Sequence, residues 1–188
     1  MNRKQFFQKS FQSGLGCCAF WAFDASDPSI KAAPEPTEEA SQVQFEREFL
    51  RNWIIDLLGA VDTELDRKTQ VKLMEATGRG CFHRFQFKQD IARQGKRDLQ
   101  KLIEAYKKNF EIWQESERVH IRYGEVSKQC YCPAANYRPS KPNDIHCECT
   151  RTTHQTIFET ALGRPFKVDV VETLRRGGKT CHFVVNLS

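Results

Sequence analysis

Long apolar runs are missing from this chain of 188 residues, and no segment after residue 28 is long and apolar enough to cross a membrane as a helix. A strong charge of one sign is missing too, since 29 lysines and arginines and 24 acidic residues leave a net charge of +5. This mild balance excludes an acidic, solvating chain and does not indicate nucleic-acid binding. A phosphate-binding loop, G-x-G-x-x-G, H-E-x-x-H and a Ser-His-Asp triad pattern are also absent. What the chain does have is eight cysteines.

The first 28 residues are typical of an export signal. Arg3, Lys4 and Lys9 give a positive start, and the uncharged stretch that follows is short and weakly apolar. This start resembles the twin-arginine signal, although a lysine replaces the second arginine. We therefore expect an exported, periplasmic protein. A lipid anchor at Cys17 or Cys18 and a cytoplasmic protein with an N-terminal amphipathic helix are the alternatives.

The proline-containing stretch at 29–42 predicts a linker, and residues 43–188 are expected to form a single domain. Apolar residues repeated every three or four positions predict helices at about 41–61, 66–80, 96–113 and 150–162. Alternation of apolar and polar residues predicts strands at 119–123, 145–149, 166–170 and 181–187. The expected fold is α+β, with N-terminal helices packed on a C-terminal antiparallel sheet and one inserted helix.

Six cysteines follow the signal segment, and four of them form two C-x-C units, Cys130 with Cys132 and Cys147 with Cys149. On a strand, residues i and i+2 point to the same face, so each unit is expected to present two sulfurs side by side. If the two units pair across the intervening loop, four sulfurs converge. Thiolates suit zinc or, as a second choice, an iron–sulfur cluster. Cys81 is a further candidate ligand.

Two other interpretations of the sulfurs stay open. An exported chain with an even number of cysteines favours disulfides, although an extended strand sets a bond within one C-x-C unit poorly. Inert buried thiols are the other possibility, and Cys181, on the apolar face of the last predicted strand, is expected to be one. Cys81 is also a candidate reactive thiol, which would make the protein an enzyme.

The C-terminal part of the chain resembles the 4-vinyl reductase-like small-molecule-binding domain. The similarity lies in the Cys147-Glu148-Cys149 unit, the helix end at 158–165, the Gly-Gly turn at 177–178 and the 181–185 strand. The 65–81 stretch and the C-x-C-Pro at Cys130 are similar to a bacterial branch of that family and to aminothiazoline-carboxylate hydrolase-like proteins. The resemblance implies the fold shared with TRAPP vesicle-tethering subunits.

The same resemblance implies a zinc site held by a glutamate and two cysteines. Glu172 and Cys181 match the first and the last of these ligands. Arg175 stands where the middle cysteine would be, so the family's zinc site does not carry over intact.

The sequence thus predicts an exported small-molecule-binding or sensory domain with a zinc or iron–sulfur site. Its candidate ligands are Cys130, Cys132, Cys147, Cys149 and Cys81. A pocket between the helices and the sheet is expected to be lined by aromatic residues such as Phe49, Trp53 and Phe110. No nucleic-acid partner is expected. The alternatives are a small-molecule hydrolase or reductase that uses a metal or Cys81, and a disulfide-stapled interaction protein without metal.

Overall fold

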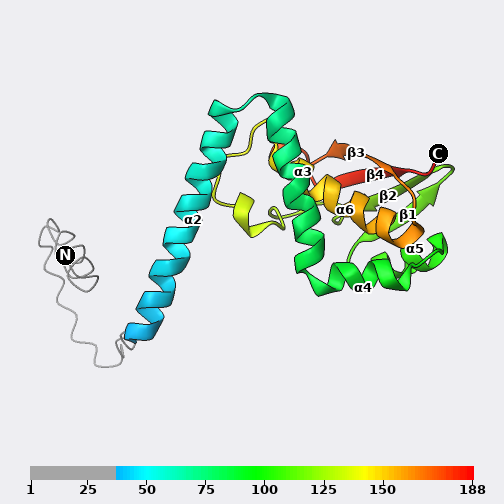
Figure 1. The fold of residues 1–188 in the computed structure, drawn as a ribbon, viewed down its shortest axis with the longest axis horizontal. Helices are drawn as coiled ribbons and strands as arrows, with labels where there is room; N and C mark the ends of the chain where they lie inside the picture. Colours follow the sequence, from blue (N-terminus) through cyan, green and yellow to red (C-terminus); the bar gives the residue numbers. More distant parts are fainter. Residues whose placement is uncertain (1–36) are drawn as a thin grey trace, which may run out of the picture. The chain divides into compact units, whose positions relative to one another are not determined.

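The computed structural model describes residues 37–188, of which 39–188 form a compact unit (Figure 1). The predicted export signal and the linker up to residue 36 lie outside the described residues. Helix α2 (Glu38–Glu64) includes the last residues of the predicted linker. Among residues 37–188, none of the helices combines the length and apolar character that a membrane span needs.

The described chain is a mixed α+β structure with a four-stranded antiparallel sheet, which confirms the predicted fold class. The sheet order is β1-β2-β4-β3. After α2, the elements are α3 (Arg67–Arg84), α4 (Gln86–Gln94), α5 (Leu99–Lys107), β1 (Glu111–Glu115), β2 (Arg118–Arg122), α6 (His146–Leu162), β3 (Lys167–Glu172) and β4 (His182–Asn186). Short 3-10 turns occur at Pro133–Ala135 and Leu174–Arg176. Helix α6 is the predicted inserted helix.

Helices α5 and α6 cover one face of the sheet (Figure 1). Alternate strand residues such as Val119, Ile121 and Phe183 point to this face and are almost fully buried against Tyr106 and Phe158. The alternation of buried and less buried residues along β2 and β4 has the period of two that a one-sided sheet requires. The main core therefore lies between the sheet and these two helices.

Helix α3 continues through the glycines that were expected to end it. Its start is as predicted, because the Asp66 side chain accepts hydrogen bonds from the backbone N–H groups of Lys68 and Thr69. Further along, a Cβ atom on Gly78 would lie 2.4 Å from the Cys149 carbonyl oxygen of α6. Gly78 thus permits close packing of two helices, and the prediction of a helix end there is wrong.

The predicted strand at 145–149 is also wrong, because these residues form the start of α6. The Asp144 carboxylate accepts a hydrogen bond of 2.9 Å from the backbone N–H of His146. Ile145, His146, Cys147 and Cys149 are all buried, so this turn is enclosed on most sides and lacks the one-sided helical pattern. Its alternating sequence therefore resembles a strand.

Candidate functional site

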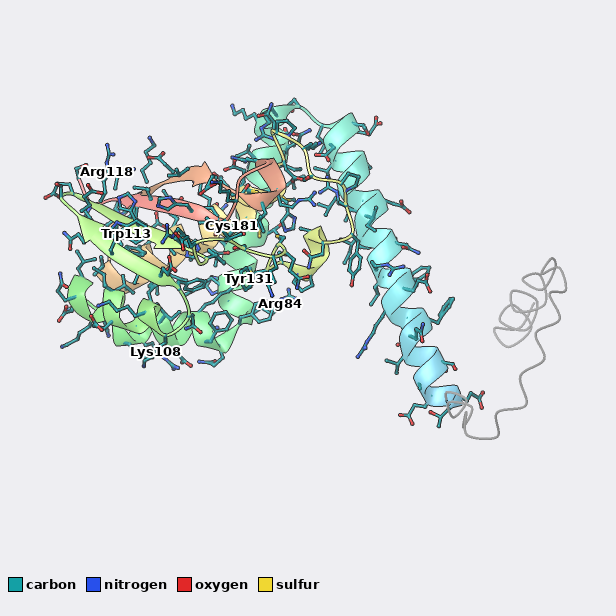
Figure 2. The ribbon with its side chains drawn as sticks, turned by 180° about the vertical axis from the view of Figure 1, so that it is seen from behind. Arg84, Lys108, Trp113, Arg118, Tyr131 and Cys181 are labelled. Carbon is teal, nitrogen blue, oxygen red and sulfur yellow. The ribbon has the colours of Figure 1, made fainter. Side chains whose placement is uncertain are left out.

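The six cysteines of the described chain are all free thiols. They come from α3 (Cys81), the segment after β2 (Cys130 and Cys132), α6 (Cys147 and Cys149) and the residue before β4 (Cys181). Figure 2 shows Cys181 at the end of the sheet opposite to Arg118. Elements that are distant in sequence thus bring thiols toward one end of the sheet.

Cys149 lies at the centre of this arrangement. Burial first, and then the nearby thiols of Cys81, Cys132 and Cys147, together raise the pKa of its thiol to about 12. Burial likewise raises the pKa of Cys132, and the nearby thiols of Cys130 and Cys81 contribute to this rise. Thiols from three separate segments therefore lie close enough to affect one another's pKa. We call Cys81, Cys130, Cys132 and Cys149 the thiol cluster.

Cys147 points to a different environment from Cys149. Residues i and i+2 of an α-helix are about 200° apart around the axis. The Cys147 Sγ lies 3.0 Å from the Thr173 hydroxyl, and burial raises its pKa to about 11. Cys149 instead packs with Leu58 and Met74. The two sulfurs of this unit are therefore not side by side as predicted, because the unit lies on a helix.

The unit at Cys130 and Cys132 does not lie on a strand either. It belongs to an irregular segment that leads into the turn at Pro133–Ala135, where the backbone N–H of Ala135 donates to the Cys132 carbonyl. Both cysteines are partly exposed, as is Cys81. The thiol cluster therefore combines one buried thiol with three that solvent reaches.

A lysine accompanies the cluster. Lys88 Nζ donates a hydrogen bond of 2.8 Å to Cys81 Sγ, and it lies 5.1 Å and 5.6 Å from the ring centroids of Phe85 and Phe87. The same lysine opposes the rise in the pKa of Cys149. An ammonium group in this place is a suitable partner for an anionic sulfur, whether bound to a metal or free.

A hydrogen-bonded Tyr-His-Tyr triad, in which Tyr106 and His154 are buried and Tyr123 is partly buried, adjoins the thiols. The Tyr106 hydroxyl lies 3.2 Å from His154 Nδ1, and the Tyr123 hydroxyl lies 3.0 Å from His154 Nε2. Burial raises the pKa of Tyr123 well above its usual value, and the thiols of Cys181 and Cys130 contribute further. Tyr123 therefore contacts His154 and also lies near the sulfurs.

This hydrogen-bonded Tyr-His-Tyr triad was not predicted from the sequence. His154 occurs on the apolar face of α6 with Ile157, Phe158 and Ala161, where the surrounding pattern indicates core residues. The available signal was the polar side chain at an apolar position, since a buried imidazole requires hydrogen-bond partners.

His154 makes stability dependent on pH. Burial lowers its pKa to about 3, so the unfolded chain binds a proton between pH 6.5 and pH 3 that the folded chain does not. This contribution is complete above pH 6.5 and is lost as the pH falls toward 3. Between pH 7 and pH 5 we expect the loss to be about 2 kcal/mol.

Urea unfolding of the wild type and of His154→Gln at both pH values measures this term. The variant is expected to lose about 2 kcal/mol less stability than the wild type between pH 7 and pH 5. Equal losses in the two proteins would show that another group is responsible. The comparison cancels the contributions of the other ionisable groups that both chains share.

The aromatic residues that were expected to line a pocket lie elsewhere. Phe49 and Trp53 on α2 are 59% and 56% exposed. Phe110 packs against Tyr106, Tyr123 and His154, with ring centroids 4.8 Å to 5.7 Å apart, and so belongs to the core. Of the three, only Phe110 lies beside the candidate site.

The glutamate and cysteines implied by the family resemblance do not form a metal site here. The Glu172 carboxylate accepts a hydrogen bond from the backbone N–H of Lys179. Arg175, at the position of the middle cysteine, is buried and hydrogen-bonded to the carboxylate of Asp144. The thiol cluster is thus the remaining candidate for soft-metal binding.

Within residues 37–188, no three His, Cys, Asp or Glu side chains already have the arrangement of metal ligands. The thiol cluster nevertheless has suitable donor atoms, a cationic neighbour and access from solvent. The sequence matches no protein-family model, and it matches no curated protein.

Proposed function

We propose that this chain is an exported small-molecule-binding or sensory module whose thiol cluster holds a thiophilic metal ion. Zinc is the first choice and an iron–sulfur cluster the second. The observation that carries the proposal is the proximity of Cys149, Cys81 and Cys132, which belong to three separate segments. Cys130 is the fourth ligand. Cys147 is the least suitable of the predicted ligands because it faces Thr173.

The mutual repulsion among the thiolates of the cluster is the part of its electrostatics that a bound cation would relieve. The raised pKa values of Cys149 and Cys132 mean that these thiols are protonated near neutral pH without a cation. A divalent metal ion stabilises the thiolate form and displaces the protons. Lys88 then offsets part of the negative charge that three or four thiolates place around the ion.

The small-molecule part of the proposal is supported by the partial exposure of three of the four thiols and by the resemblance to the 4-vinyl reductase-like domain. The finer fold assignment to that TRAPP-like group is part of the proposal. It is supported by helices on one face of a four-stranded antiparallel sheet and by the helix inserted between β2 and β3. If only three thiolates bind the metal and Cys130 does not, the fourth position would be available to a ligand molecule.

Zinc binding by single-cysteine variants tests the ligand set. The full chain, purified with reductant, is titrated with Zn²⁺ against a chromophoric chelator, and its metal content is measured by mass spectrometry. We expect one ion per chain in the wild type. Cys149→Ser and Cys132→Ser should bind Zn²⁺ at least tenfold more weakly, because each removes a ligand.

Cys147→Ser is the matched control, since it makes the same chemical change two residues away on the same helix. It should bind Zn²⁺ as the wild type does. Equal affinity in Cys149→Ser and the wild type would exclude the proposed ligands. A metal-free protein with fewer than six reactive thiols after residue 28 would instead favour disulfides.

A thiol-dependent enzyme is the second candidate, favoured by the hydrogen bond from Lys88 to Cys81. In that case Cys81 would be the nucleophile for a small-molecule hydrolase or reductase reaction. A metal-free protein in which iodoacetamide modifies Cys81 much faster than the other thiols would favour this alternative.

A further inference from the structure

The face of the sheet opposite to α5 and α6 carries a pair of histidines. His120 on β2 and His182 on β4 belong to adjacent antiparallel strands, in which Ile121 pairs with Phe183. Ile121 and Phe183 point into the core, so the neighbouring histidines point to the other face. The histidine pair is therefore separate from the thiol cluster, although Cys181 directly precedes His182 in sequence.

The two imidazoles face each other with ring nitrogens at ligand spacing. His120 Nδ1 lies 3.0 Å from His182 Nε2. Two imidazole nitrogens bound to one zinc ion, each about 2.0–2.1 Å from it, are themselves roughly 3 Å apart. Without a metal, the two nitrogens share one proton in a hydrogen bond. A cation bound by both would release that proton to solvent and lie to one side of the line between the nitrogens, so the rings must turn slightly to bind it.

The surroundings of His120 match those of a metal-binding histidine. Its other nitrogen, Nε2, is buried without a hydrogen bond and lies 3.5 Å from a carboxylate oxygen of Glu115. Metal-binding histidines usually donate their second N–H to a carboxylate, which orients the ring and makes it a better ligand. Glu115 is in position for this role once the Nδ1 atom binds a cation.

Trp113 holds both rings in place. Its indole stacks on His120 with centroids 4.8 Å apart and planes 9° apart, and it lies 5.5 Å from His182. Trp113 is labelled on strand β1 in Figure 2. Arg122, whose positive charge acts on His182, also lies over the indole, and it forms an ion pair with Glu111. Much of its repulsion toward a cation is thereby offset.

From this geometry we infer a second metal site on the open face of the sheet, with His120 Nδ1 and His182 Nε2 as its protein ligands. Imidazole nitrogens select late first-row divalent ions such as Ni²⁺, Cu²⁺ and Zn²⁺ over Mg²⁺ or Ca²⁺. The two protein ligands leave the other coordination positions to water or to donor atoms of a further ligand. The inference does not depend on the thiol cluster.

Titration of the full chain with Ni²⁺ tests this site, because Ni²⁺ quenches the fluorescence of an adjacent tryptophan. We expect saturable quenching in the wild type and a rise in melting temperature with Ni²⁺. His120→Gln and His182→Gln should each weaken the apparent Ni²⁺ affinity at least tenfold. Melting curves without metal confirm that both variants fold, and the metal-dependent rise in melting temperature is the second readout.

Three controls make the result specific. His83→Gln changes an exposed histidine on α3 and should leave Ni²⁺ binding unchanged. Cys149→Ser should also retain the quenching, so failure of the thiol-cluster proposal does not affect this test. Trp113→Phe should lose most of the signal while equilibrium dialysis still detects bound Ni²⁺. Unchanged Ni²⁺ affinity in both histidine variants would overturn the inference.

Discussion

Replacing Gly78 with alanine is expected to lower the free energy of unfolding by about 3 kcal/mol. The added Cβ atom would lie 2.4 Å from the Cys149 carbonyl oxygen and 2.9 Å from the Thr152 Cβ, both on α6. The carbonyl belongs to the helix backbone and cannot turn away as a flexible side chain would. The two helices must therefore separate, which also disturbs the hydrogen bond from the Thr153 hydroxyl to the Gly78 carbonyl.

Gly80→Ala is the matched control. Gly80 lies in the same helix, and a Cβ atom there meets nothing within 4 Å. This replacement should stabilise the protein by roughly 0.5–1 kcal/mol, because alanine favours the helix more than glycine does. Urea unfolding followed by circular dichroism measures both changes. Effects of the same sign for the two alanines would contradict the role assigned to Gly78.

These two glycines show the limit of predicting helix ends from sequence. Glycine commonly ends a helix, as Gly163 does after α6 with a φ of 72°. Glycine also occurs where two helices pack closely, and only the tertiary structure separates the two cases. The prediction for Gly163 was correct because a proline follows shortly after, whereas no proline follows Gly78 or Gly80.

The spacing of apolar residues was sufficient to predict the helices and strands that have one clear apolar face. Helix α2 and strands β2, β3 and β4 lie close to the predicted ranges. It failed at Trp113, which shares helical spacing with Phe110 and earlier apolar residues but pairs with His120 in a β-hairpin. Helix α4 was also missed, because it is short and only Ile91 and Ala92 of its residues are buried.

The candidate site was predictable in composition but not in geometry. The sequence indicated which thiols to consider, and Cys81, Cys132 and Cys149 are neighbours in the folded chain. Assigning Cys147 and Cys149 to a strand placed their sulfurs on one face, whereas the helix points them apart. The partners Lys88 and Tyr123 belong to no recognisable motif, so only the folded structure shows that they lie beside the thiols.

A second large effect is expected from the replacement of Arg175. Its guanidinium donates to the Asp144 carboxylate at 2.5 Å and 3.0 Å, and Asp144 is fully buried. It also donates to the backbone carbonyls of Ala135, Arg138 and Pro139. One buried side chain thus holds the segment that connects Cys132 to α6.

Arg175→Met should destabilise the protein by about 3–5 kcal/mol, because it leaves the Asp144 carboxylate buried without its partner. The released 133–145 segment should also be cleaved faster by chymotrypsin after Tyr137, which is followed by Arg138. Arg176→Met is the control: Arg176 pairs with Glu148 and donates to the Asp144 backbone carbonyl, but its loss leaves the Asp144 carboxylate paired with Arg175, so it should cost only about 1–2 kcal/mol. Denaturant unfolding separates the two outcomes, and equal losses would refute the role given to Arg175. Adding Asp144→Leu to Arg175→Met should restore part of the stability, since the unpaired charge is then gone.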